Sequence, residues 1–388
     1  MVGSQMRTSG LRDLVVARGR ANGLDAVGVA ETSPFEHTRR DLEERKAAGL
    51  HADMQFTYRD PGRSTDPSRT LPGARSLVVG AVHYASRPAP SDPAPSGPAM
   101  GRVARYAVGN HDAVLRAALD AVSQDLRHRG FRTVVLADDN ALVDRAAAHR
   151  SGLGWFGKSS NLLLPDRGSW FVLGAVLTDA VLEPSDGPVA DGCGTCRRCI
   201  DGCPTGAIVG DGIVDARRCL SWLLQSPGTF PHEHREALGD RIYGCDDCQE
   251  VCPPNRRSDR RSDGGDEHTV GTAVGTSRMD VLWMLRAGDD ELLAAVGRWY
   301  VPGRDPDHLR RNALLVLGNT ADPAASATLD ALRAYLRHPD GVLAGHAAWA
   351  ALRMGRPSLL DEPGVDDRPE VLAERQRGTV ARPGTPVT

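Results

Sequence analysis

The chain has 388 residues, 40 % hydrophobic and 25 % charged, which is the composition of a globular protein with two or three domains. Its net charge of −3 excludes a broad nucleic-acid-binding coat but permits a local basic patch. No apolar run approaches the roughly 20 residues that cross a bilayer, so we expect no membrane association.

The first part of the chain, residues 1–185, alternates helical and strand patterns. Periodic apolar residues predict helices, and short β-branched runs predict strands. Such alternation predicts an α/β domain whose strand ends carry the ligand-binding residues. Asp138 stands at one of these strand ends. The helices are expected at 12–24, 111–130 and 142–154, and the strands at 26–30, 75–84, 131–138 and 168–179.

The last part of the chain is expected to be helical. Residues 257–280 are polar and glycine-rich, which indicates a linker. The segments "LRRNALLVLGN" and "GHAAWAALRMG" resemble each other at a separation of about 35 residues, which predicts one or two HEAT-like repeats within 281–356. Residues 357–388 lack periodicity and are expected to form a flexible tail.

All eight cysteines lie between positions 193 and 252. Disulfide frameworks belong to small secreted domains, and the N-terminus shows no secretion signal, so we expect reduced thiols in a cytoplasmic protein. The first run has the spacing C-x2-C-x2-C-x3-C-P of bacterial ferredoxins, in which the fourth cysteine binds the other cluster. This run consists of Cys193, Cys196, Cys199 and Cys203.

The second cysteine run is one ligand short. Cys245, Cys248 and Cys252 precede a proline, and Cys252 stands where a ferredoxin ligand crosses to the first cluster. The second cluster then holds Cys203, Cys245 and Cys248, and Cys219 is the only cysteine left to complete it. The count therefore predicts two four-cysteine [4Fe-4S] clusters in a ferredoxin-like domain, residues 186–256.

Two simpler interpretations compete with this one. Paired C-x2-C motifs also build tetrahedral zinc sites, although the repeated Cys-Pro ending favours iron–sulfur. A bare ferredoxin would also need both runs, but most of this chain lies outside them. The clusters are therefore expected to pass electrons to another group.

The cysteine order, together with "GLGWFGKSSNLLLP", "RGSWFVLG" and "YGCDDCQEVCP", resembles the epoxyqueuosine reductases, from about residue 10 to 355. The resemblance implies base-off cobalamin in the N-terminal domain, beside the second cluster.

The resemblance also implies site residues. The family's proton donor begins a D-x-x-P-V-L-E-R motif, which here reads "DDNALVDR" and starts at Asp138. Asn140 and Ala141 depart from that motif, Asp144 replaces its glutamate, and Asp139 is a rival for the acid. The implied cobalamin-binding residues are Arg63, Lys158, Leu162, Leu173, Ser221 and Asp246.

The implied function is the reduction of epoxyqueuosine to queuosine at the wobble position of tRNA. The partners would be the tRNA anticodon stem-loop and an external low-potential electron donor, and the protein is expected to be a monomer. Arg310 and Arg311 would lie in the RNA-facing helical segment. The alternatives are a related cobalamin and iron–sulfur reductase of another substrate, such as an organohalide, and an electron-transfer adaptor.

Overall fold

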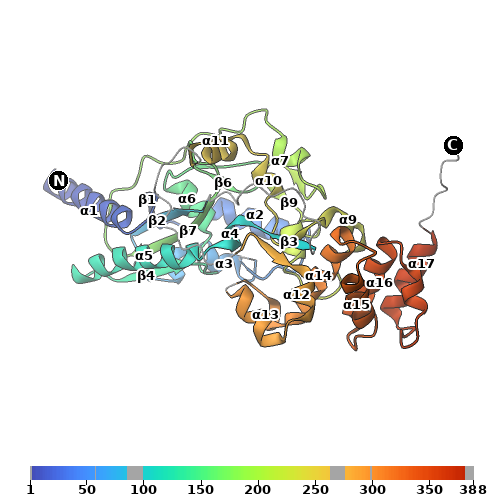
Figure 1. Ribbon diagram of the computed structural model, residues 1–388. Coiled ribbons are helices and arrows are strands. Elements are labelled where there is room, and N and C mark those ends of the chain that lie inside the picture. Colours follow the sequence, from blue (N-terminus) through green and yellow to red (C-terminus); the bar gives the residue numbers. More distant parts are fainter. Residues whose placement is uncertain (1, 57, 85–98, 263–275, 298, 381–388) are drawn as a thin grey trace. The chain divides into compact units, whose positions relative to one another are not determined.

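The computed structural model describes residues 2–56, 58–84, 99–262, 276–297 and 299–380 (Figure 1). The chain forms two compact units, each drawn from several stretches of sequence. The first unit comprises Met1–Arg87, Val108–Cys219 and Asp246–Val274, and the second comprises Pro88–Ala107, Leu220–Cys245 and Gly275–Thr388. None of the helices in the described ranges is long and apolar enough to span a membrane.

A four-stranded sheet lies at the centre of the first unit. Its order is β1-β2-β7-β4. The four expected strands are confirmed, because each apolar run is buried in this sheet. The strands are β1 (Ala26–Glu31), β2 (Ser76–His83), β4 (Thr133–Ala137) and β7 (Phe171–Thr178).

The sheet is antiparallel at every pairing. Alternating helices and strands usually build parallel sheets, but here β7 pairs between β2 and β4 and runs opposite to both. The carboxyl ends of the strands are therefore not gathered at one edge. The rule that open parallel sheets bind ligands at the carboxyl ends of their strands therefore does not apply to Asp138, whose position depends on its own loop.

Helices cover both faces of this sheet. α1 (Val2–Ala21) and α5 (His111–His128) contribute to one core, and α2 (Glu36–Ala47) and α6 (Asp144–Arg150) contribute to the other. The expected helices at 111–130 and 142–154 are thus confirmed, and α1 extends the one expected at 12–24.

Two paired glycines let α5 approach the sheet closely. Gly80 on β2 lies opposite Gly174 on β7, and a Cβ at Gly174 would come within 2.8 Å of a methyl group of Leu119. A Cβ at Gly80 would come within 2.7 Å of Leu24. A side chain at either position would push the helix away from the sheet.

The remaining elements of the first unit are short and carry the loops of the candidate site. They are α3 (Pro61–Ser64), the 3-10 turn Pro67–Arg69, β5 (Trp155–Phe156), β6 (Leu162–Leu163), α7 (Arg198–Asp201), β8 (Ile208–Gly210), β9 (Ile213–Val214), α10 (Asp247–Glu250) and α11 (Pro253–Ser262).

The second unit combines a small sheet with helices. Its sheet has the order β10-β3-β11, and among its helices α16 packs against α14, α15 and α17. The strands are β3 (Met100–Val103), β10 (Arg241–Tyr243) and β11 (Arg278–Asp280). The helices are α8 (Leu220–Leu223), α9 (Arg235–Leu238), α12 (Val281–Arg286), α13 (Asp289–Val296), α14 (Pro306–Thr320), α15 (Ser326–Leu336), α16 (Gly341–Arg353) and α17 (Pro369–Val380). 3-10 turns cover His232–His234, Pro302–Arg304 and Pro357–Asp361, and α4 (Arg105–Val108) ends at the boundary with the first unit.

The expected linker at 257–280 is wrong at both ends. Residues up to Ser262 continue α11, and Arg278–Asp280 form β11, which pairs antiparallel with β3. Polarity suggested a linker, but eight of the ten residues of α11 are polar, and two of these, Asn255 and Ser258, are buried and anchor the helix. Residues 263–275 of this expectation lie outside the described residues.

The expected flexible tail at 357–388 is also wrong up to residue 380. Leu359, Leu360 and Val371 are buried, and α17 packs on α16. The Arg235 guanidinium lies 3.0 Å from the Glu374 carboxylate, and both side chains are buried. These contacts fix the segment although its sequence is polar, and residues 381–388 lie outside the described residues.

The units also divide the expected cluster domain, 186–256. Residues up to Cys219 and from Asp246 onward belong to the first unit, whereas Leu220–Cys245 belong to the second. Spacing alone could not show this, because the inserted segment contains β10, which pairs with β3 from another part of the chain.

Candidate active site

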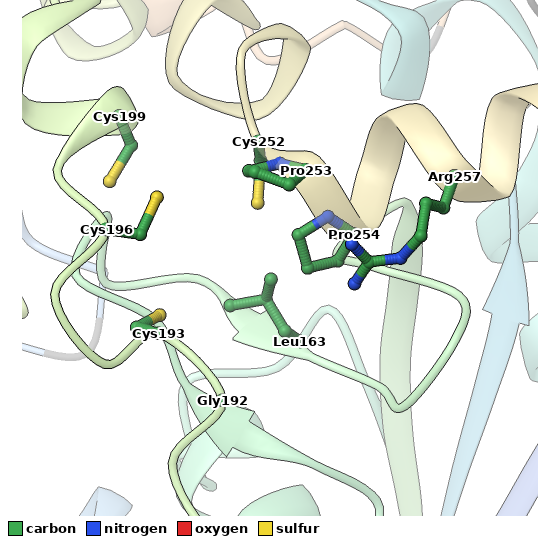
Figure 2. Close-up of a pocket in the computed structure, with 9 residues that line it drawn as sticks. All are labelled: Leu163, Gly192, Cys193, Cys196, Cys199, Cys252, Pro253, Pro254 and Arg257. Atoms are coloured by element: carbon green, nitrogen blue, oxygen red, sulfur yellow. The ribbon is translucent and has the colours of Figure 1, made fainter.

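Four cysteines from the two runs line one cavity of about 100 Å³ in the first unit. Figure 2 shows Cys193, Cys196 and Cys199 along one loop, with Cys252 facing them from the start of α11. These are the four residues that the spacing assigns to the first cluster, including the crossing ligand. Leu163, Gly192, Pro253, Pro254 and Arg257 complete the lining.

Cys252 is placed by the first turn of α11. Its carbonyl accepts the N–H of Arg256 at 3.0 Å, and Pro253 follows it at a position where the absent N–H costs nothing. Burial raises the pKa of the Cys252 thiol to about 11, and the backbone N–H of Asn255 opposes this shift. The thiol is therefore protonated without metal, and cluster binding would release its proton.

The loop of the first run rests on the G-W-F-G-K segment. A Cβ at Gly192 would lie 2.7 Å from the ring of Trp155, so only glycine fits beneath the indole. Asp191 accepts the N–H of Cys193 at 2.9 Å. The segment that carries the family resemblance thus supports the cysteine loop directly.

The G-W-F-G-K segment is a tight hairpin. Trp155 pairs with Leu163 and Phe156 with Leu162. A Cβ at Gly154 would lie 2.0 Å from the carbonyl oxygen of Leu163, which explains the first glycine of the segment. Leu162 is buried by this pairing.

Lys158 follows the hairpin strand and is held at both ends. Its ammonium lies 3.2 Å from Asp211, and its carbonyl accepts the N–H of Gly212 at 3.0 Å. Its side chain is only 16 % exposed, so it is not the solvated loop cation that a lone lysine usually is.

The segment after Gly212 leads to Cys219 and touches a second loop. The N–H of Ala216 donates to the carbonyl of Leu50 at 2.8 Å, and the neighbouring His51 has a buried Nδ1 that lacks a partner among the described residues. His51 could not be predicted as a candidate site residue, because a single histidine in a loop has no distinctive spacing.

The cysteines assigned to the second cluster are only partly brought together. The Cys203 sulfur accepts the N–H of Ala207 at 3.2 Å, and the Thr205 hydroxyl donates to the carbonyl of Arg218, next to Cys219. Cys248 lies on α10 of the same unit, whereas Cys245 belongs to the second unit. The grouping of these four ligands stays a prediction.

The loop after β4 presents two exposed acids. Asp138 has φ 53°, in the left-handed region that aspartate and asparagine adopt more readily than most residues. The Asp139 carboxylate accepts the N–H of Ala141 at 2.8 Å and so shapes the turn. Asp144 is also exposed, yet a dense shell of protein atoms raises the pKa of its carboxyl, and the charge of Asp138 adds to that shift.

The other expected cofactor residues are scattered over both units. Arg63 is exposed on α3, Leu173 is half-buried on β7, and Asp246 is 4 % exposed at the start of α10. Ser221 belongs to the second unit, on α8.

Arg310 and Arg311, which were expected to lie in the RNA-facing segment, are both engaged within the protein, and the RNA contact of that segment stays a prediction. Arg311 is 2 % exposed, and its guanidinium donates to the carbonyls of Leu223, Ser226 and Gly228. Arg310 is paired with Asp289 at 2.6 Å and with Asp307 at 2.7 Å. The sequence could not separate a charged helix end from a charged side chain that ties a helix to neighbouring loops.

The cysteine cavity and its two-run ligand pattern define the class of this protein, a double-cluster iron–sulfur protein. A family model for a 4Fe-4S double cluster binding domain matches residues 192–255, and a model described as "Epoxyqueuosine reductase QueG, DUF1730" matches residues 64–139.

The relatives identify the family. The chain is 32 % identical to an epoxyqueuosine reductase of Bacillus cereus over 95 % of this chain and 93 % of the relative. It is 33 % identical to an epoxyqueuosine reductase of Vibrio cholerae, over 84 % and 88 % of the two chains. The chain belongs to the epoxyqueuosine reductase family.

Solved structures show the same fold. An epoxyqueuosine reductase with a tRNA-Tyr epoxyqueuosine-modified stem loop superposes with a TM-score of 0.84 at 30 % identity, covering 95 % of this chain and 98 % of that one. The Bacillus subtilis epoxyqueuosine reductase, solved with an aspartate-bearing catalytic loop swung out of the active site, gives a TM-score of 0.83 at 30 % identity over the same shares of the two chains.

Proposed function

We propose that this protein reduces epoxyqueuosine to queuosine at the wobble position of tRNA, with two [4Fe-4S] clusters and cobalamin. The observation that carries the proposal is the cavity shared by Cys193, Cys196, Cys199 and Cys252. This cavity brings three cysteines of the first run together with the last cysteine of the second run. The relatives that span nearly all of the chain are epoxyqueuosine reductases, which supports the substrate.

The overall reaction fits one-electron carriers. Removing the epoxide oxygen leaves a carbon–carbon double bond, consumes two electrons and two protons, and releases water. Clusters deliver single electrons, and bound cobalamin would supply the carbon-directed reducing chemistry that side chains lack. The protein itself would hold the clusters and cobalamin, orient the substrate, exclude water from the site and supply a proton.

The residues around Lys158 fit a corrinoid. The segment 212–219 is hydrogen-bonded to Lys158 and to Leu50, and the buried unpartnered Nδ1 of His51 adjoins that contact. A macrocycle rimmed with amides offers donors and acceptors for such a nitrogen. Leu173 is half-buried and offers apolar surface, whereas Leu162 is buried and would act by shaping the hairpin. Arg63, Ser221 and Asp246 complete the proposed cofactor set.

Asp138 is the proposed proton donor. The Bacillus subtilis relative has a catalytic loop that carries an aspartate, and Asp138 lies on the loop after β4. The turn-forming hydrogen bond from the Ala141 N–H is accepted by Asp139. The protonated carboxyl of Asp138 would give its proton to the departing oxygen. The protein is proposed to act in the cytoplasm as a monomer, and residues 281–356 are proposed to form HEAT-like repeats that contact the tRNA.

The proposal is tested on the anaerobically reconstituted protein. With cobalamin, a chemical reductant and tRNA that carries epoxyqueuosine, nucleoside mass spectrometry should show epoxyqueuosine replaced by queuosine. A protein that loads both clusters and cobalamin and leaves epoxyqueuosine unchanged would contradict the proposal. A halogenated phenol offered in place of tRNA separates it from the organohalide alternative.

A further inference from the structure

One face of α11 carries a row of arginines beside the cysteine cavity. The helix reads PPNRRSDRRS. Arg256, Arg257 and Arg260 are exposed, and we name these three residues the arginine stripe. Positions three and four apart lie on one helix face, so the stripe continues the face that begins at Pro253.

The opposite face of α11 is fixed to the protein. Asn255 and Ser258 are buried. Asn255 accepts the N–H of Ser169 at 2.6 Å, and the Ser258 hydroxyl lies 3.3 Å from the His83 ring. The helix therefore cannot rotate, and the stripe is held outward.

The stripe begins at the cavity itself. Figure 2 shows Arg257 beside Cys252, with the rings of Pro253 and Pro254 between the guanidinium and the sulfur atoms. Among the described residues no hydrogen bond or ion pair engages the side chain of Arg257 or Arg260, whereas Arg256 donates to the carbonyl of Glu250. Arg257 and an apolar rim thus adjoin the proposed cluster ligands, and Arg260 follows Arg257 on the same helix.

A second pair of arginines lies within the cysteine loop. Arg197 and Arg198 are exposed between Cys196 and Cys199. Arg197 lies 3.8 Å from Asp201, an exposed pair that contributes little binding energy. Among the described residues, the acids within six positions of these arginines in the sequence are Asp191, Asp201, Glu250 and Asp259. The sequence of α11 contains four arginines and one aspartate, although the whole chain has a net charge of −3.

We propose that the arginine stripe, with Arg197 and Arg198, is the docking surface for an acidic one-electron carrier protein, such as a reduced ferredoxin or flavodoxin. The proposal rests on the proposed cluster at the four-cysteine cavity. In each encounter the carrier is oxidised by one electron and that cluster is reduced by one, and two encounters supply one turnover. The cysteines are only partly buried, so a docked carrier could approach them closely.

The chemistry of this surface favours an electron carrier over RNA. Charges around an apolar centre speed the encounter and release of weakly bound partners, as electron-transfer complexes require. An RNA loop would need exposed aromatic side chains for its splayed bases, and the cavity rim offers prolines and a leucine instead.

The test is cluster reduction by a plant-type ferredoxin, followed by stopped-flow absorbance in the reconstituted holoprotein. Arg256→Glu/Arg260→Glu leaves the cavity lining intact. It should lower the second-order rate constant at least about tenfold at low ionic strength, and the rate should depend less on salt. Equilibrium binding of oxidised ferredoxin, measured by surface plasmon resonance, should weaken in parallel.

Three controls separate charge from other effects. Arg129→Glu, at the exposed end of α5, should keep the parent rate. Arg256→Lys/Arg260→Lys should also stay near it, because the positive charge remains. Reduced methyl viologen, a small cation, should reduce the double-glutamate variant at least as fast as the parent, which excludes a shifted cluster potential as the cause.

The outcomes are distinct. Equal ferredoxin rates in the parent and the double-glutamate variant, with clusters loaded in both, would overturn the docking surface and leave the proposed function standing. A loss of tRNA affinity with an unchanged ferredoxin rate would assign the stripe to RNA and overturn the inference. A parent protein that cannot hold a cluster at the cavity would contradict both.

Discussion

The amide of Asn255 and the hydroxyl of Ser169 hold the crossing cysteine in place. The Asn255 oxygen accepts the Ser169 N–H at 2.6 Å, and its nitrogen donates to the Ser169 hydroxyl at 3.0 Å, with both residues buried. A Cβ at Gly168 would lie 1.9 Å from the same amide oxygen. This contact connects α11, which follows Cys252, to the segment before β7.

Asn255→Ala should therefore weaken the first cluster site. Its removal leaves the Ser169 N–H and the Gln249 carbonyl without their buried partner, which costs about 1–3 kcal/mol of unfolding free energy. We expect lower thermal stability and loss of iron from the first cluster. Asn255→Asp keeps an acceptor for the Ser169 N–H but places a buried oxygen against the Gln249 carbonyl, so it should also lower thermal stability. Equal iron content in Asn255→Ala and the parent would contradict this role.

The crossing of ligands gives a second prediction. Cys252→Ala should remove the first cluster, although Cys252 belongs to the second run, and Cys219→Ala should remove the second. Each variant, purified anaerobically, should hold clearly less iron than the parent, and the electron paramagnetic resonance spectrum should show which cluster survives. Two intact clusters in Cys219→Ala would refute its assignment.

The sequence predicted local elements well because their signals are local. The strands of the first unit and helix α5 are continuous apolar patterns, and the first-cluster ligands follow from a fixed spacing. The interleaving of the two units was not predictable, because it depends on pairings such as β10 with β3, which are distant in the sequence.

Side-chain roles were harder to predict. Arg311 has the sequence pattern of an exposed helix end, but its guanidinium donates to the carbonyls of Leu223, Ser226 and Gly228 and to the side-chain oxygen of Asn312. Arg257 belongs to no sequence motif. It lies at the cavity because α11, the helix that carries it, begins directly after Cys252. Such roles depend on where helices pack, which charge patterning alone does not show.

Arg311 gives a stability prediction. Burial lowers the pKa of its guanidinium to about 9, with Arg235 adding to the shift, so the side chain is still charged at neutral pH. Arg311→Ala leaves several buried carbonyls without donors and should lower the unfolding free energy by about 3 kcal/mol or more. Circular dichroism during heating would measure this. Arg310→Ala, whose partner Asp289 is exposed and whose partner Asp307 is partly exposed, should have a smaller effect.

His308 predicts acid sensitivity of the second unit. Its ring nitrogen lies 2.7 Å from the Leu224 carbonyl, and burial lowers its pKa to about 4 from an ordinary 6.5. Because the unfolded chain binds the proton more tightly, stability is full above pH 6.5, falls between 6.5 and 4, and levels off below. The loss is about 3 kcal/mol. His308→Gln should make stability depend less on pH between 6.5 and 4, which hydrogen exchange of α14 would measure. The same pH profile in this variant and the parent would contradict the role of His308.

Asp138 gives the catalytic prediction. Asp138→Asn keeps the shape of the side chain and its tolerance of a left-handed backbone, but removes the proton. The variant should load both clusters and cobalamin and accept electrons, yet turn over about 10²–10⁴-fold more slowly, the usual cost of losing general acid catalysis. Single-turnover conversion of epoxyqueuosine in tRNA measures the rate.

Asp139→Asn is the matched control for this rate. Asparagine retains the oxygen that accepts the Ala141 N–H, so the turn should persist and the rate should fall little. If Asp139→Asn were slow and Asp138→Asn fast, the departures at Asn140 and Ala141 would have moved the acid by one residue. If neither variant slowed turnover, the proton would have to come from another group. Asp144 would be tested next, because its raised pKa lets the carboxyl hold a proton more readily than an ordinary aspartate.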